Sequence, residues 1–176
     1  IGWHDYDDFD FEFIEDEAGD RLANRERVFT GAYVITNQGI SAPKQEVVVN
    51  YFLKALWEAT PEIVKLAQTT QSWEKVAKRM MQIQGFGGTG FMTKEVLLDT
   101  TYTGFWEFQT NEDDGSFSFP GDWHKWTPIG PGALRGAARV LGDDQAKPVK
   151  NEQAFQCIMN LVNLQDLFFG HDFHLS

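Results

Sequence analysis

The sequence predicts an all-α domain of five to seven helices with at most a trace of strand. Residues 44–59 repeat apolar side chains at the spacing of one helix face. Two further helix patterns flank a glycine-dense turn at 83–90, and a glycine–proline turn at 130–136 opens another. With 176 residues, the chain has the length of one domain.

The first 26 residues are acidic and aromatic. They hold ten Asp and Glu side chains against two arginines, a net −8 of the total −11. Phe9, Phe11 and Phe13 recur with a period of two, which predicts an extended arm or short edge strand. Such an arm is usually solvated, although it could cover a basic groove or dock a partner. We therefore divide the chain into an acidic aromatic arm, 1–26, and a single helical domain, 27–176.

Apolar periodicity and helix boundary signals mark the helices of this domain. Ser41, Thr60 and Ser72 stand where they can cap the helices that follow them. The predicted helices are 22–33, 44–59, 61–67, 73–80, 91–102, 131–141 and 151–169. A loop as long as the irregular stretch 103–127 is usually either functional or disordered. Its aromatic side chains argue against disorder.

The turn between the fourth and fifth of these helices is a candidate phosphate site. Four glycines crowd it, and glycine serves where backbone takes a positive φ or approaches another group closely. The N–H groups that begin the next helix have no partner within the helix and carry the positive end of its dipole. We expect this helix–hairpin–helix to hold a nucleic-acid backbone; the alternative is a tight turn between two core helices.

The second glycine site begins the helix at 131. Pro131 suits a first helical turn, and Gly130 and Gly132 allow close approach to the backbone. Arg135 and Arg139 are four residues apart, so they share one helix face. Free N–H groups and two guanidinium groups can hold a phosphate or pyrophosphate. The alternative is an ordinary helix start with two surface arginines.

Composition excludes several classes of protein. The net charge argues against a general nucleic-acid binder, although the body of the domain is nearly neutral. The single Cys157 excludes an internal disulfide and fits a reducing cytosol, so we expect a cytoplasmic protein. No segment has the length of a membrane span. The histidines form no metal set, no ATP-binding phosphate loop occurs, and we expect neither metal nor cofactor.

Three stretches carry a specific resemblance: Gln84–Gly87, Asp99–Tyr102 and Gly130–Gly136. In this order they resemble the phage enzymes of thymine hypermodification, the α-glutamyl/putrescinyl thymine pyrophosphorylases or amino acid:DNA transferases. The domain is also similar to the helical domain found with 5-hydroxymethyluracil DNA kinases, and to the helix–hairpin–helix DNA glycosylases. The resemblance covers roughly residues 72–170. Its closing motif matches Asn163–Phe168, with Asn163 where an aspartate is usual.

The resemblance implies a transferase acting on DNA. Its substrate would be 5-hydroxymethyluracil that carries a pyrophosphate, which an amino acid or polyamine displaces. The implied site residues have four roles. Pyrophosphate would bind to Gly130, Pro131, Gly132, Arg135, Arg139, Asn163 and Gln165. The DNA backbone would bind to Gly85, Gly87, Gly88, Thr89, Gly90 and Lys94. The base would stack on Trp123 and Trp126, and the catalytic residues would be Asp99, Arg135 and His124.

Two other functions remain open from the sequence. One is a non-catalytic DNA-binding module associated with a hydroxymethyluracil DNA kinase, which would need the hairpin but not the second glycine site. The other is a DNA glycosylase. The chain lacks the aspartate that glycosylases place near Gly130–Gly132 and the lysine that they place near Thr89, although Asp122 could substitute for the aspartate.

Overall fold

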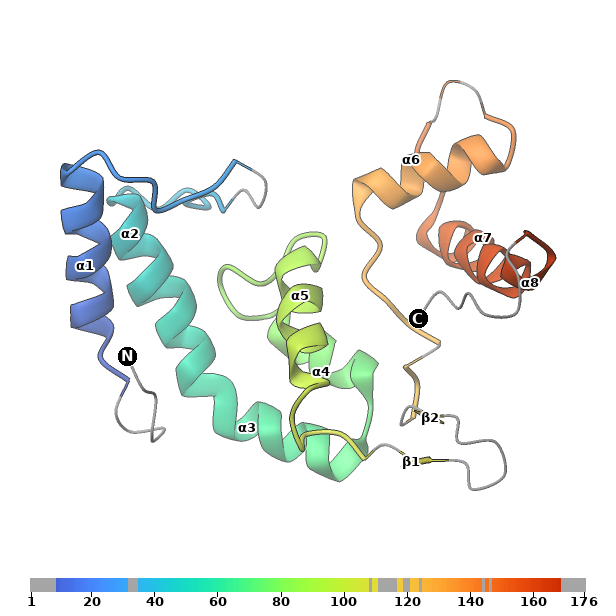
Figure 1. Cartoon of the computed structure of the whole chain (residues 1–176), viewed down its shortest axis with the longest axis horizontal. Helices are drawn as coiled ribbons and strands as arrows, with labels where there is room; N and C mark the ends of the chain where they lie inside the picture. Colours follow the sequence, from blue (N-terminus) through green and yellow to red (C-terminus); the bar gives the residue numbers. More distant parts are fainter. Residues whose placement is uncertain are drawn as a thin grey trace.

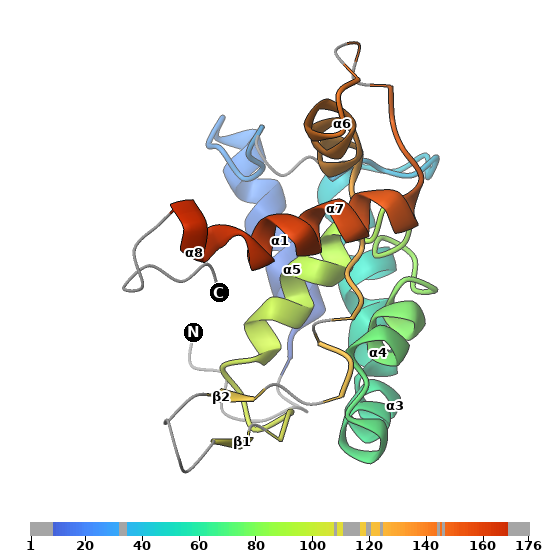
Figure 2. The same ribbon diagram turned by 90° about the vertical axis from the view of Figure 1, so that its right-hand side faces the viewer.

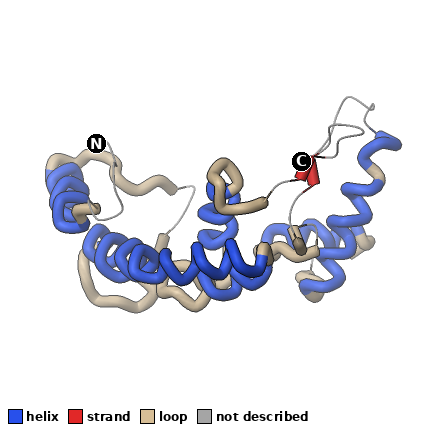
Figure 3. Tube along the Cα trace, turned by 90° about the horizontal axis from the view of Figure 1, so that it is seen from below, coloured by secondary structure: helices blue, strands red, loops and turns tan. Residues whose placement is uncertain are grey.

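The computed structural model describes residues 9–31, 35–107, 109–110, 117–118, 121–123, 125–143, 145 and 147–168. The fold is all-α, as predicted, and its helices are strung out along the long axis of the molecule (Figures 1 and 3). The elements, in chain order, are α1 (Phe11–Ala23), α2 (Lys44–Glu46), the π-helix η2 (Val47–Leu53), α3 (Lys54–Thr70), α4 (Trp73–Met80), α5 (Phe91–Thr100), β1 (Gln109–Thr110), β2 (Phe117–Ser118), α6 (Pro131–Val140), α7 (Asn151–Asn163) and α8 (Gln165–Phe168). The two short strands pair antiparallel.

The prediction of an extended N-terminal arm is wrong for its described part, because α1 is a helix. The side chain of Asp10 caps it by accepting a hydrogen bond from the N–H of Phe13 at 3.0 Å. Acidic side chains in the first turn also suit the positive end of the helix dipole. The helix ends at Ala23, so the helix predicted over 22–33 is not formed in the described residues.

No residue of α1 is buried, so α1 lies on the surface of the molecule. The ring of Phe9 packs against that of Trp57 with their centroids 4.6 Å apart. The amide of Asn50 donates a hydrogen bond to the carboxylate of Glu15 at 2.6 Å. The segment predicted as a free arm is therefore docked on the long helix through a few peripheral contacts.

The segments α2, η2 and α3 form one continuous helix from residue 44 to residue 70. The predicted break at Thr60 and Pro61 is wrong, because Pro61 lies inside α3. Ile63 and Ala67, beyond the proline, are buried in the core, and this burial stabilises the helix past the missing N–H. Nor does Ser41 cap its start, since Pro43 is the N-cap residue and no side chain bonds there.

Two separate clusters of side chains form the core. The larger joins α3, α4 and α5 and contains Trp73, Met80 and Leu97. The smaller lies between α6 and α7 and has Ala137, Ala154 and Cys157 at its centre. Figures 1 and 2 show α6 and α7 next to each other, joined to the rest of the molecule by an extended linker, residues 125–130.

The predicted last helix, 151–169, is interrupted. Helix α7 ends at Asn163, and the N–H of Leu164 bonds to the carbonyls of Asn160 and Leu161 before α8 begins at Gln165. The part of the chain that the structure describes has no helix that combines the length and apolar character needed to cross a bilayer.

Candidate functional site

The glycine hairpin between α4 and α5 is confirmed as a turn that needs positive φ. Gly85 has φ +93° and Gly90 has φ +74°. A Cβ atom on Gly85 would run into the ring of Phe52, and one on Gly90 would lie 2.6 Å from Cβ of Pro128. Only Gly88, at the exposed tip beside Thr89, has φ +66° with no atom within 4 Å of the added Cβ. The packing of the fold thus accounts for Gly85 and Gly90, while Gly88 faces open space.

Helix α5 begins at this hairpin without a side-chain cap. Its N-cap is Gly90, and the hydroxyl of Thr93 donates a 2.7 Å hydrogen bond back to the carbonyl of Phe86. The predicted DNA contact Lys94 is not a free cation, because its ammonium lies 2.8 Å from the carboxylate of Glu95. The exposed tip, Gly88 and Thr89, is therefore the part of the hairpin most open to a ligand.

The aromatic segment before the linker is part of the fold. The carboxylate of Asp122 accepts hydrogen bonds from the Ser72 hydroxyl at 2.7 Å and the Trp73 N–H at 2.6 Å, so it caps α4. The neighbouring Trp123 packs on the ring of Trp73 with centroids 4.0 Å apart. Asp122 is thus engaged in holding the start of a helix, and Trp123 belongs to the edge of the larger cluster.

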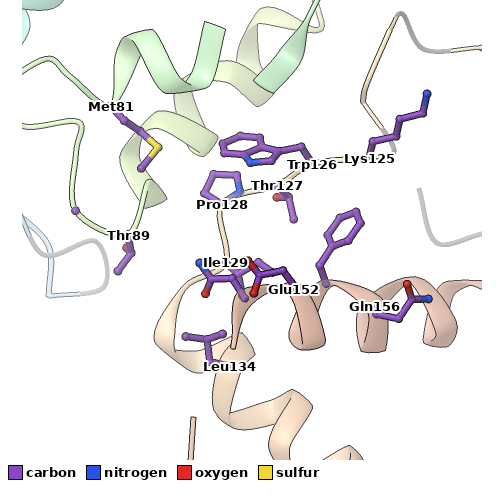
Figure 4. Close-up of a pocket in the computed structure, with 13 residues that line it drawn as sticks. Met81, Thr89, Lys125, Trp126, Thr127, Pro128, Ile129, Leu134, Glu152 and Gln156 are labelled. Carbon is purple, nitrogen blue, oxygen red and sulfur yellow. The ribbon is translucent and has the colours of Figure 1, made fainter. Parts of the chain in front are cut away.

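A pocket of about 720 Å³ lies between the hairpin, the linker and the α6–α7 pair. This is the size of a typical small-ligand site. It is lined by Met81, Gly88, Thr89, Lys125, Trp126, Thr127, Pro128, Ile129, Leu134, Asn151, Glu152, Phe155 and Gln156. Figure 4 shows Trp126 and Pro128 of the linker beside Met81, with Glu152 and Gln156 on α7 across from them.

The wall of this pocket combines apolar and polar groups. Trp126, Met81 and Phe155 offer apolar surface, and the hydroxyls of Thr89 and Thr127 offer hydrogen bonds. Glu152 is the one carboxylate among the lining residues, and it makes no ion pair within the described chain. A planar ring against Trp126 and an amine against Glu152 both suit such a wall.

The helix start predicted at the second glycine site is confirmed, because α6 begins there. Gly130 is the N-cap residue, Pro131 takes the first helical position, and no side chain caps the helix. Arg135 and Arg139 are exposed and make no ion pair in the described part of the chain. Neither arginine lines the pocket, but Ile129, immediately before Gly130, does.

The structure thus brings together only some of the residues that the sequence singled out. Gly88, Thr89 and Trp126 meet at the pocket, beside the start of α6. Asp99 is exposed near the end of α5 and lines no described pocket. Asn163 is exposed at the end of α7 and Gln165 begins α8, away from the pocket wall. His124 lies outside the described residues.

No pattern in the sequence predicted the α7 residues that line the pocket. The sequence pattern does not distinguish Glu152, Phe155 and Gln156 from the other residues of an amphipathic helix. They line the same pocket as Trp126 only because α7 packs beside the linker. Among the described residues, no group of histidine, cysteine and carboxylate side chains is arranged to hold a metal ion.

Comparison with known proteins identifies the family of this chain but no individual related protein. The family model described as "5-hmdU DNA kinase, helical domain" matches residues 1–171. No curated protein matches the chain, and no solved structure matches it. The family match begins at residue 1 rather than near residue 72, so it includes the acidic N-terminal segment and the long helix α2–η2–α3.

Proposed function

The chain belongs to the 5-hmdU DNA kinase helical-domain family, and on this premise we propose that it acts in the modification of hydroxymethyluracil in DNA. More specifically, we propose an amine transferase. The amine nitrogen attacks the methylene carbon of a pyrophosphorylated hydroxymethyluracil, the C–O bond breaks, and pyrophosphate leaves with the electron pair. The amine then loses one proton to give a substituted aminomethyluracil.

The observation that supports this proposal best is the pocket between the hairpin and α7. The hairpin tip, Gly88 and Thr89, forms part of its rim, so a strand held at the hairpin would bring its bases to the pocket. A base must leave the duplex stack before an enzyme can modify it, and aromatic side chains receive such bases. Both Trp123 and Trp126 pack against the larger core cluster. Trp126 also lines the pocket and takes this role in our proposal, while Trp123 stacks on Trp73.

In our proposal Glu152 takes the catalytic role that the sequence analysis assigned to Asp99 or His124. A carboxylate in a partly apolar pocket can bind the incoming amine and accept its proton. Glu152 is across from Trp126 in the pocket and has no ion pair among the described residues (Figure 4). Asp99 lines no described pocket, so our proposal gives this role to Glu152 instead.

The start of α6 would stabilise the leaving group. Pyrophosphate departs readily when preorganised donors meet its developing charge. The uncapped N–H groups after Pro131, close in the chain to Ile129 of the pocket wall, supply such donors. Our proposal adds the guanidinium of Arg135, which makes no ion pair in the described chain and does not line the pocket. Conversely, the glycosylase alternative finds no support, because the carboxylate of Asp122 is engaged in capping α4.

A second candidate rests on the family description. Because this describes the helical domain of a DNA kinase, the chain could bind DNA for a hydroxymethyluracil DNA kinase without catalysing a step of its own. In that case Arg135→Ala should leave the affinity for DNA nearly intact and change no chemistry. Under the transferase proposal, the same substitution lowers the rate of pyrophosphate release.

The experiment measures pyrophosphate released from DNA that bears pyrophosphorylated hydroxymethyluracil, in the presence of a panel of amines. Glu152→Gln should lower the rate by about 100-fold or more, the usual size of a general-base contribution. Trp126→Ala should also lower it, because it removes the surface on which the base stacks. The matched controls are Tyr102→Ala, an exposed ring outside the pocket, and Glu58→Gln, an exposed carboxylate on α3. If the pocket variants release pyrophosphate as fast as these controls, the pocket is not the catalytic site.

A further inference from the structure

One face of α6 consists of glycine and arginine and is not covered by the described chain. Gly132, Arg135, Gly136 and Arg139 follow the spacing i, i+3, i+4, i+7, which places them on one side of a helix. On the other side, Leu134 lines the pocket and Ala137 and Ala138 are buried. The glycine–arginine face, defined by these four residues, therefore lies outside both the pocket and the core.

The packing of the described chain does not require glycine at either glycine position of this face. A Cβ atom on Gly132 or Gly136 would meet no atom within 4 Å, and neither residue has a positive φ. Glycine inside a helix is nevertheless less stable than alanine. In the hairpin, by contrast, contacts with Phe52 and Pro128 explain Gly85 and Gly90. The open glycines of α6 fit a requirement that a partner approach the helix backbone closely.

The charge around this face favours an anionic partner. Residues 125–150 hold five Lys and Arg side chains and two Asp, in a chain whose net charge is −11. The four ion pairs of the described chain involve Arg21, Lys78, Arg79 and Lys94, all outside this segment. The guanidinium groups of Arg135 and Arg139 therefore stay available for phosphate oxygens, which they can bind in a bidentate manner.

We propose that the glycine–arginine face binds the sugar–phosphate backbone of DNA, with Arg139 on a backbone phosphate rather than on the pyrophosphate. The missing side chains at Gly132 and Gly136 let a strand lie against the helix, and Arg139 fixes its position without reading its sequence. This inference rests on the proposed function only for the identity of the polyanion as DNA. It moves the main backbone contact from the hairpin, where Lys94 is paired with Glu95, to α6.

The test measures binding of the full chain to an unmodified duplex by fluorescence anisotropy at several salt concentrations. Arg139→Ala should weaken binding several-fold and reduce the slope of log affinity against log salt by about one, the value for one lost phosphate contact. Lys75→Ala is the matched control, because Lys75 is an exposed helical cation without an ion pair in the described chain. It should leave affinity and slope unchanged.

A second pair of variants separates binding from stability. Gly136→Ala should raise the melting temperature, because alanine favours the helix, and yet weaken DNA binding, because its methyl group keeps the strand away. Gly19→Ala in α1, where an added Cβ also meets no atom within 4 Å, should raise the melting temperature without changing binding. A structural role alone cannot make a stabilised variant bind DNA less well.

Three results would overturn the inference: wild-type affinity and salt slope in Arg139→Ala, wild-type affinity in Gly136→Ala, or no duplex binding by the unaltered chain. It would also be overturned if Arg139→Ala lost affinity for inorganic pyrophosphate while keeping its affinity for DNA, since the face would then hold the leaving group. DNA binding that depends on Arg139 without any adduct formation would refute the transferase proposal and leave this inference standing.

Discussion

The substitution Gly85→Ala tests whether the hairpin is fixed by its contact with the long helix. At φ +93°, any side chain is strained, which costs about 1–2 kcal/mol in the left-handed region. The new Cβ would also lie 2.8 Å from Cβ and Cδ1 of Phe52, and such overpacking of a core costs about 1–3 kcal/mol. We therefore expect a loss of about 2–5 kcal/mol in the free energy of unfolding.

Gly88→Ala is the control that separates the two causes. Gly88 also has a positive φ, +66°, but its Cβ would meet no atom within 4 Å, so only the backbone strain of about 1–2 kcal/mol applies. Urea denaturation of both variants gives the difference from their midpoints, provided that the m-value stays constant. Phe52→Leu in the Gly85→Ala background should recover part of the loss, which a double-mutant cycle measures. Equal losses for Gly85→Ala and Gly88→Ala, or an additive cycle, would refute the packing argument.

Three further predictions concern stability and the division between fold and site. Asp122→Ala should lower the free energy of unfolding by about 1–2 kcal/mol in urea titration, because it uncaps α4; an unchanged midpoint would contradict this role. Hydrogen bonds from Arg79 hold the pKa of Glu62 below its ordinary value of 4.5. This pair therefore stabilises the fold above pH 4.5, and the stabilisation is lost as the pH falls through the lowered pKa. Glu62→Gln should make the melting temperature less sensitive to acid. An identical dependence of the melting temperature on pH in both proteins would count against this prediction. Trp123→Ala should lower the melting temperature more than Trp126→Ala does. Trp126→Ala should lower the rate of pyrophosphate release per folded molecule more than Trp123→Ala does. The reverse order in either measurement would contradict our assignment.

Local signals in the sequence were enough to predict the turns and several helix boundaries. The glycines predict a turn at the hairpin because glycine tolerates the positive φ that three of them adopt there. The start of α6 follows from the preference of proline for the first helical position, and Ser72 caps α4 through bonds within one turn. These features depend on neighbours along the chain, so a single sequence contains the information for them.

Features that depend on distant contacts were missed or predicted wrongly. The alternating phenylalanines predicted an extended arm, but the structure has a helix there. Asp10 caps this helix, and Phe9 packs against Trp57 of the long helix. The core beyond Pro61 overrides the break expected at proline. Likewise, Glu152 becomes a site residue only because α7 packs beside the linker, and no spacing in the sequence reports that contact.

The most direct test of the account is mass spectrometry of the nucleosides from DNA bearing pyrophosphorylated hydroxymethyluracil, after incubation with this protein and a panel of amines. We predict a new nucleoside whose mass equals that of hydroxymethyldeoxyuridine plus the amine minus water, together with released pyrophosphate. The adduct should be lost in Glu152→Gln. Unchanged nucleosides on DNA that the protein still binds would contradict the transferase proposal and favour the kinase-associated binding module, and an abasic site would indicate a glycosylase instead.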